Sequence, residues 1–243
     1  MTLRFEPSQD TSRHSLPIYV QVSELLVREI LAGRLIDGER LPPERVMAKT
    51  MGVAIGTLRK ALGDLADKGY LRRIQGSGNY VRASGGGPHA SLYAMFRLEL
   101  PEGGGLPRAR ILEVSVRPKP EALPPFGAAA TATRIRRLRS LNHVPVALEE
   151  IWLCSNQGDV DPARAADSLY DYYRRVLGFW ITRAEDRVGV APLPDWAPGA
   201  LDKAPQTPVG FVERLSWADR RIPIEYSRTW FDPDQARYVQ RMR

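Results

Sequence analysis

The sequence has one cysteine, Cys154, among its 243 residues. A lone cysteine cannot form an intrachain disulfide or a multi-cysteine metal site, so a secreted disulfide scaffold is excluded. Histidine is also scarce, with three residues. The sequence shows no Gly-rich phosphate loop and no cluster of metal ligands. We therefore expect no cofactor, no metal and no catalytic site.

Long apolar runs are also missing. No segment approaches the roughly 20 apolar residues that a membrane span needs, and residues 1–13 lack the apolar centre of a signal peptide. With 43% hydrophobic and 26% charged residues, the composition is typical of a globular protein of more than one domain. The sequence predicts a cytoplasmic protein without a membrane partner.

The net charge is +7, with a sequence pI near 9.7. Most of the excess lies in residues 12–83, which contain 12 Lys and Arg against 7 Asp and Glu. A basic first third favours an anionic partner such as nucleic acid.

Three amphipathic segments come first. Residues 16–32 and 41–51 read as helices, and Leu58, Ala61, Leu62 and Leu65 recur at helical spacing in a third. Two short strands joined at Gly76-Ser77-Gly78 follow. The order predicts a winged helix-turn-helix, whose third helix enters the major groove. An ordinary helical bundle with a solvated charged face is the alternative on this pattern alone.

The stretch Ser84-Gly85-Gly86-Gly87-Pro88 interrupts the helical pattern and reads as a flexible linker. The rest of the chain predicts an α+β domain around an antiparallel sheet. Its helix is expected at Ala163–Leu177, and its strands at Arg110–Val116, Thr133–Leu141, Val146–Leu153, Pro208–Trp217 and Pro223–Phe231.

Several motifs in residues 16–82 resemble the DNA-binding domain of the GntR family of bacterial regulators. They are Leu41-Pro42-Pro43-Glu44-Arg45, Gly52-Val53, Thr57-Leu58-Arg59-Lys60-Ala61-Leu62, and residues 69–81 with the wing glycines. The resemblance implies DNA contacts by Arg45, Thr57, Arg59, Lys60, Gly76 and Gly78. Arginine can hold a guanine or a phosphate with two hydrogen bonds, and glycine lets the backbone approach closely.

Three positions differ from the family pattern. Pro43 and Ala54 stand where the family usually has serines that cap helices, and Ile55 stands where it often has arginine or proline. These differences leave fewer side chains for reading bases, so the operator sequence is not predicted.

Residues 92–243 resemble the HutC subfamily and its effector-binding UTRA domain, which has a chorismate-lyase-like fold. The resemblance is carried by residues 134–139, 145–150, 168–170 and 224–228. Arg137 and Arg139 project from one face of a strand, and the hairpin at Asn142-His143 returns Glu149 toward them. The family implies a site for a small anion formed by Arg137, Arg139, Glu149, Ser168, Tyr170 and Glu225. The alternatives are a solvated sheet face and structural ion pairs.

These observations predict a winged helix-turn-helix domain at 12–83, a linker at 84–91 and a UTRA-like effector-binding and dimerisation domain at 92–243. The resemblance implies a homodimeric transcriptional repressor that a small anionic metabolite releases from double-stranded operator DNA. The linker is expected to absorb the change. A nonspecific architectural DNA-binding protein is the first alternative. An enzyme that uses Glu149 or Glu225 as a general base is the second.

Overall fold

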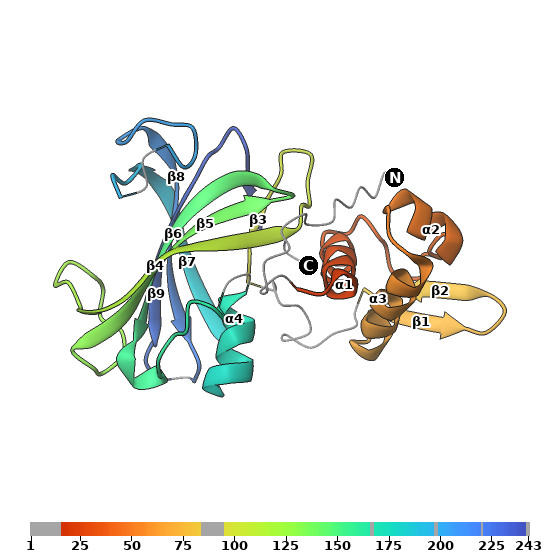
Figure 1. Ribbon diagram of the computed structural model, residues 1–243, viewed down its shortest axis with the longest axis horizontal. Coiled ribbons are helices and arrows are strands. Elements are labelled where there is room, and N and C mark those ends of the chain that lie inside the picture. The colour runs from red at the N-terminus through yellow and green to blue at the C-terminus, as the bar shows by residue number, and fades with distance from the viewer. Residues whose placement is uncertain (1–15, 84–94, 166–167, 197–198, 220, 242–243) are drawn as a thin grey trace. The chain divides into compact units, whose positions relative to one another are not determined.

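In the computed structural model the chain forms a helical unit and a sheet unit (Figure 1). The structure describes residues 16–83, 95–165, 168–196, 199–219 and 221–241. The helical unit contains the described residues up to Phe96, together with Glu102–Leu106 and the chain from Gln240. The sheet unit contains Arg97–Pro101 and Pro107–Val239. The linker expected at 84–91 and residues 12–15 lie outside the described residues.

The helical unit has three helices and a hairpin: α1 (Ile18–Leu31), α2 (Glu44–Thr50), α3 (Ile55–Asp67), β1 (Leu71–Ile74) and β2 (Gly78–Val81). The apolar positions predicted for α3 are fully buried and pack against α1 and α2. Between α2 and α3, Gly52 has a φ of +64°, which glycine adopts without strain. β1 and β2 pair in antiparallel register. The arrangement confirms the predicted winged helix-turn-helix.

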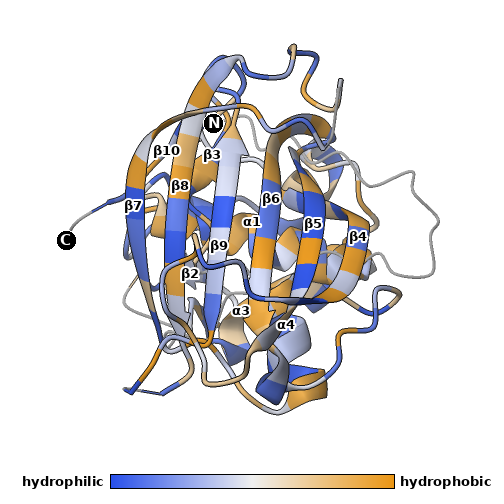
Figure 2. Cartoon of the chain, turned by 90° about the vertical axis from the view of Figure 1, so that its left-hand side faces the viewer, coloured by the Kyte–Doolittle hydropathy of each residue, from blue (hydrophilic) through white to orange (hydrophobic). Residues whose placement is uncertain are grey.

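The sheet unit is built on six antiparallel strands in the order β4-β5-β6-β9-β8-β7 (Figure 2). These strands are β4 (Pro107–Pro118), β5 (Thr131–Leu141), β6 (Val144–Cys154), β7 (Arg183–Pro192), β8 (Pro208–Trp217) and β9 (Glu225–Phe231). A separate two-stranded sheet joins β3 (Leu98–Glu99) to β10 (Arg237–Tyr238). The predicted α+β domain with an antiparallel sheet is confirmed.

The two faces of the six-stranded sheet are covered differently. On the inner face, Ile135, Ile151 and Leu153 pack against α4 (Leu169–Tyr172) and the π-helix η2 (Tyr173–Leu177). The outer face carries Trp152 and Trp230, which pack with side chains of the connecting segments. A short 3-10 helix, η1 (Ser155–Gln157), follows β6. Side chains alternate between the two faces along each strand. Arg137, two residues after Ile135, and Glu149, two residues before Ile151, therefore lie on the inner face.

Two expectations for the sheet unit are corrected. The helix predicted over Ala163–Leu177 begins only at Leu169, because Ser168 has an extended backbone and caps it by accepting a hydrogen bond from the Asp171 N–H. The strand β7 was not predicted. Its central residues Glu185, Asp186, Arg187 and Gly189 give no apolar alternation, and the strand forms because β8 supplies ten consecutive pairing positions.

Candidate functional site

The candidate DNA-binding residues gather at α2, α3 and the hairpin of the helical unit. Arg45 lies in the first turn of α2, and Arg59 and Lys60 lie on the side of α3 opposite its buried residues; all three are exposed. Thr57 is half-buried in the first turn of α3. These side chains are therefore available to a ligand, as the winged helix-turn-helix requires.

An ion pair connects α2 to α3. The Arg59 Nε lies 2.7 Å from the Glu44 Oε2 atom, while the Arg59 side chain is 63% exposed. The Arg73 Nη2 atom of β1 donates to the Arg59 carbonyl oxygen at 3.3 Å. Glu44 and Arg73 were not among the predicted site residues. Glu44 holds the Arg59 side chain against α2, and Arg73 ties the wing to the Arg59 backbone. Both contacts depend on the tertiary structure.

The wing glycines sit at the tip of the hairpin, with φ values of +74° at Gly76 and +129° at Gly78. Both are exposed. A side chain at Gly78 would also meet Arg40, whose Nε is 3.3 Å from the ideal Cβ position. Both positions therefore suit glycine. A surface hollow beside them is lined by Glu44 and residues 73–79.

The candidate effector residues gather on the inner face of the sheet. Strand pairing places Arg137 directly across from Glu149. The Arg137 Nη2 atom donates to the Glu149 Oε2 atom at 2.6 Å, and the Arg139 Nε lies 3.8 Å from the same oxygen. Both arginines are buried, at 5% and 3% exposure. The alternative of a solvated sheet face is therefore wrong for these two arginines.

Arg137 has unused hydrogen-bonding capacity. Its Nε and Nη1 atoms are buried and have no hydrogen-bond partner among the residues that the structure describes. Leaving a buried charged donor unsatisfied is costly. An anion bound against these two nitrogens would remove that cost.

Glu225 lies at the other end of the cluster and is 1% exposed. It receives hydrogen bonds from Tyr173 at 2.7 Å, Ser216 at 3.0 Å and Tyr170 at 3.1 Å. No arginine forms an ion pair with it within the described part of the chain. The alternative that Glu225 balances Arg137 or Arg139 in an ion pair is therefore wrong. Ser168 is half-buried and, as noted, caps α4.

The structure adds a half-buried ion pair that the sequence did not reveal. On β8, Arg214 binds Asp186 of β7 through two hydrogen bonds of 2.5 and 2.6 Å. The Tyr238 hydroxyl donates to the Asp186 Oδ2 atom at 2.6 Å. Together with these residues of β8, the groups described above form what we call the inner-face cluster: Arg137, Arg139, Glu149, Tyr170, Tyr173, Arg214, Ser216 and Glu225. Arg214 lies two residues from Ser216 on β8 and so shares its face of the sheet. Its carboxylate partner Asp186 lies on β7, a strand that was not predicted.

The pKa values of the two carboxyl groups of the cluster, Glu149 and Glu225, are shifted in opposite directions. Burial raises the pKa of Glu149, but the guanidiniums of Arg137 and Arg139 outweigh burial and hold that pKa below its ordinary value. Burial raises the pKa of Glu225, and hydrogen bonds from its hydroxyl partners offset only part of the rise. The cluster therefore favours an ionised Glu149 and disfavours a charge on Glu225, leaving its guanidiniums in excess.

No helix in the described residues is long and apolar enough to cross a membrane. Likewise, the described ranges hold no group of three or more His, Cys, Asp or Glu side chains arranged to bind a metal ion.

Comparison with known proteins identifies both units. Residues 18–81 match the model of the bacterial regulatory proteins of the gntR family, and residues 102–237 match the UTRA domain. The chain is 50% identical to the HTH-type transcriptional regulator SmoD of Agrobacterium fabrum over 94% of this chain and 97% of SmoD. It is 27% identical to MngR of Escherichia coli, the repressor of a mannosyl-D-glycerate transport and metabolism system, over 92% and 95% of the two chains.

Solved structures show the same fold. The protein YydK of Bacillus subtilis aligns over 94% of this chain and all of its own, with a TM-score of 0.54 at 20% identity. The ligand-binding domain of a GntR-family regulator from Bordetella bronchiseptica aligns over 60% of this chain and 96% of its own, with a TM-score of 0.52 at 24% identity.

Proposed function

This chain belongs to the GntR family of bacterial transcriptional regulators with a UTRA domain, and we propose that it is a cytoplasmic repressor released from its operator by a small anionic metabolite. The observation that carries the proposal is the pair of buried Arg137 nitrogens without a partner in the described structure. A site that leaves a cation incompletely satisfied is suited to an anionic ligand.

The surroundings of Arg137 support a ligand that also has hydroxyl groups. Glu149 and Glu225 supply carboxyl oxygens as acceptors, and Tyr170 supplies a hydroxyl near both β8 and β9. Among the relatives, MngR is named for a mannosyl-D-glycerate system, and glycerate pairs a carboxylate with hydroxyls. We infer an effector of this class, a hydroxylated organic anion such as a sugar acid or a phosphorylated sugar.

The DNA-binding function rests on the exposed residues of the helical unit. Arg45, Arg59 and Lys60 present three cations to solvent, which suits phosphate and base contacts. Thr57 lies in the first turn of α3, and Gly76 and Gly78 lie at the tip of the hairpin, where the lack of a side chain allows close backbone approach.

We infer that the active form is a homodimer paired through β7. The edge strand β4 has Pro107 and Pro118 at its ends, a register shift between Ile111 and Glu113, and three arginines against one glutamate. Prolines, bulges and like charges are devices that block edge pairing. A second copy is therefore disfavoured at β4.

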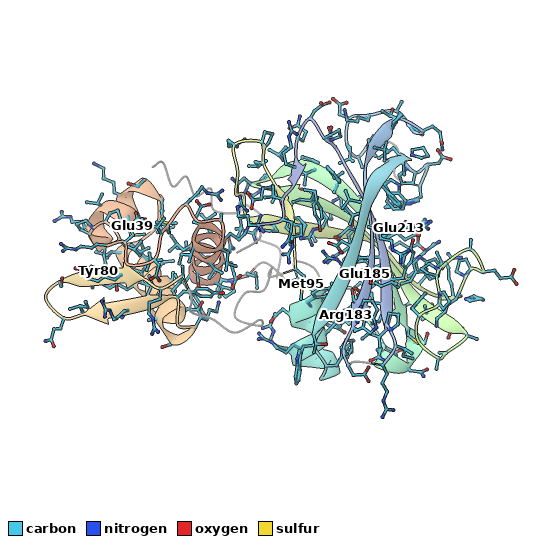
Figure 3. All side chains as sticks on the ribbon, turned by 180° about the vertical axis from the view of Figure 1, so that it is seen from behind. Glu39, Tyr80, Met95, Arg183, Glu185 and Glu213 are labelled. Carbon is cyan, nitrogen blue, oxygen red and sulfur yellow. The ribbon has the colours of Figure 1, made fainter. Side chains whose placement is uncertain are left out.

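At the opposite edge, β7 has one proline, Pro192 at its end, and pairs with β8 without a register shift. Its two arginines balance Glu185 and Asp186; Arg183 and Glu185 are labelled in Figure 3. Val188 and Val190 of β7 are 55% and 74% exposed. Two copies related by a twofold axis at Asp186 would place Glu185 of each opposite Arg187 of the other. This self-complementary charge pattern favours a second copy of the chain as the occupant of the β7 edge.

Fluorescence anisotropy tests the proposed function directly. The purified chain is titrated onto DNA from its own upstream region and onto a scrambled duplex, at two salt concentrations, with and without a panel of sugar acids and sugar phosphates. We expect specific binding that one anion reverses. Equal binding to both duplexes, steeply dependent on salt and insensitive to every anion, would instead support a nonspecific architectural protein.

The enzymatic alternative has little support. The relatives are named transcriptional regulators, and Glu149, the ionised acid of the cluster, is held in an ion pair with Arg137. We therefore assign the inner-face cluster to binding rather than catalysis.

A further inference from the structure

Five residues between β3 and β4 belong to the helical unit, although the residues on both sides of them belong to the sheet unit. We call Glu102–Leu106 the strap. Leu106 is 4% exposed and is part of the apolar core formed by α1, α2 and α3. The next residue, Pro107, already pairs with Leu141 as the first residue of β4. One peptide bond therefore joins the core of the helical unit to an edge strand of the sheet.

The strap is shaped to fit the end of α1. Gly103, Gly104 and Gly105 have φ values of +97°, +68° and +90°, and three such residues in a row are suited to glycine alone. A Cβ at Gly104 would lie 2.8 Å from the Glu29 Oε1 atom and 3.0 Å from the Arg34 Nη2 atom. The backbone of the strap thus packs closely against this ion pair.

Glu29 and Arg34, which the strap contacts, form an ion pair with two hydrogen bonds. The Arg34 Nε and Nη2 atoms donate to the two carboxylate oxygens of Glu29 at 2.6 and 2.7 Å. Such a bidentate pair is well defined in geometry. Because the geometry of this pair is fixed, a shift of the strap is expected to displace the end of α1.

The other end of the strap leads directly to the effector residues. On β5, Arg139 stands across from Ala109 of β4, and Arg137 stands across from Ile111. Ala109 is only three residues from Leu106. Both register shifts near the cluster fall in this region, one after Ile111 and one between Arg139 and Ser140. Bulges of this kind let a strand re-aim a side chain locally.

Within the helical unit, α1 is tied to the recognition helix α3. The Ser23 hydroxyl donates to the Asp64 carboxylate, and the Lys68 Nζ lies 2.8 Å from the Glu24 Oε1 atom. Glu24 is fully buried. A displacement of α1 would consequently be passed to α3, which carries Arg59.

We propose that the strap transmits the occupancy of the inner-face cluster to the DNA-binding helices. The inference rests on the proposed function and specifies how the same site is regulated. When an anion draws Arg137 and Arg139 toward it, the start of β4 moves with β5, and Leu106 moves in the helical core. The motion disturbs α1 and, through it, the position of α3 on DNA.

The decisive variant inserts Gly-Ser between Leu106 and Pro107. It leaves the strap residues and the sheet residues unchanged but lets them move independently. The control carries the same insertion after Glu121, in an exposed turn between β4 and β5. Inorganic phosphate serves as the probe for Arg137, and DNA from the upstream region serves as the probe for the helical unit.

The measurement is the dissociation constant of phosphate in the absence and presence of saturating DNA, because coupling between two sites is reciprocal. For the wild type and the control insertion we expect DNA to weaken phosphate binding by about 5-fold or more. For the insertion at Leu106 we expect a ratio near 1, with each separate affinity within about twofold of the wild type.

A ratio in the Leu106 insertion equal to that of the wild type would overturn the inference and leave the proposed function intact, since coupling would then follow another route. A wild-type ratio of 1 would also overturn it. Phosphate binding that is unchanged in Arg137→Ala would refute the proposed anion site itself, and the strap mechanism with it.

A second pair of variants tests the fit of the strap without changing its length. Gly104→Ala introduces both φ strain and a collision with the Glu29–Arg34 pair, whereas Gly38→Ala has a similar φ of +78° and open space around its Cβ. We expect Gly104→Ala to reduce the coupling ratio and Gly38→Ala to preserve it. Equal ratios in the two variants would contradict the proposed contact.

Discussion

Arg137 and Glu149 face each other across β5 and β6, joined by a 2.6 Å hydrogen bond that engages only one of the three guanidinium nitrogens of Arg137. The other two nitrogens are buried and have no hydrogen-bond partner in the described chain. Glu149 thus orients Arg137 without satisfying it. This incomplete pairing is what a preorganised anion site requires, since the ligand supplies the missing acceptors.

Replacing Arg137 with alanine is expected to abolish release of operator DNA by the effector while leaving operator affinity within about twofold. Loss of one charged hydrogen-bond donor to an anion costs about 1.5 to 3 kcal/mol, or roughly 10- to 150-fold in affinity. The measurement is anisotropy of labelled operator against effector concentration. The double variant Arg137→Met with Glu149→Gln removes the Arg137–Glu149 ion pair without leaving either of these two partners charged. Retained effector release in both variants would disprove the assignment.

Replacing Arg59 with alanine is expected to weaken operator binding by about 5- to 150-fold, the range for one lost arginine–base contact. Its partner Glu44 and Arg59 itself are partly exposed, so we expect a loss of stability below about 1 kcal/mol. Operator affinity and thermal unfolding are measured together. Arg117→Ala, an exposed arginine of the sheet unit, is the control and should bind operator like the wild type. Equal losses in the two variants would point to a nonspecific charge effect.

The β7 edge is expected to be the dimer interface. Val188→Lys combined with Val190→Lys should weaken dimerisation at least about tenfold, because two copies would bring four new ammonium groups together. Val116→Lys, at a residue of β4 that is 62% exposed, is the matched control. Sedimentation equilibrium gives the dissociation constants. A dimer that survives the β7 changes but dissociates in the β4 variant would reverse the assignment of the edges.

The sheet unit should lose stability in acid partly through Glu113. Hydrogen bonds from Arg134 and Ser115 lower the pKa of this carboxyl from 4.5 to about 2. Because the folded-state pKa is depressed, its contribution is present above pH 4.5 and is lost as the pH falls toward 2. We expect Glu113→Gln to cost about 1 kcal/mol at pH 6, after allowance for solvent screening, and almost nothing near pH 2.

Urea unfolding followed by tryptophan fluorescence measures this effect, because all five tryptophans lie in the sheet unit. Glu121→Gln, in an exposed turn, provides the control and should not change the pH profile. A Glu113→Gln deficit that is the same at pH 6 and near pH 2 would show that packing, rather than ionisation, accounts for the loss.

The sequence carried enough local information to predict the helical unit. The buried face of α3 follows from the 3.6-residue period of Leu58, Ala61, Leu62 and Leu65, and the wing follows from Gly76 and Gly78. Part of the inner-face cluster could also be predicted from the sequence, since Arg137 and Arg139 alternate on one strand and a tight hairpin returns Glu149 beside them. Period and turn chemistry are properties of neighbouring residues, so they can be read without the fold.

The sequence by itself therefore determined the order of the domains, the strand alternation and the hairpin that joins Arg137 to Glu149. Only the tertiary structure decided that β7 forms against β8, that Asp186 pairs with Arg214, and that Gly104 lies on Glu29 and Arg34. These contacts join residues 16 to 75 positions apart, and their energy comes from burial and pairing between distant segments. Local propensity cannot encode such pairings, because each partner becomes favourable only when the other is already in place.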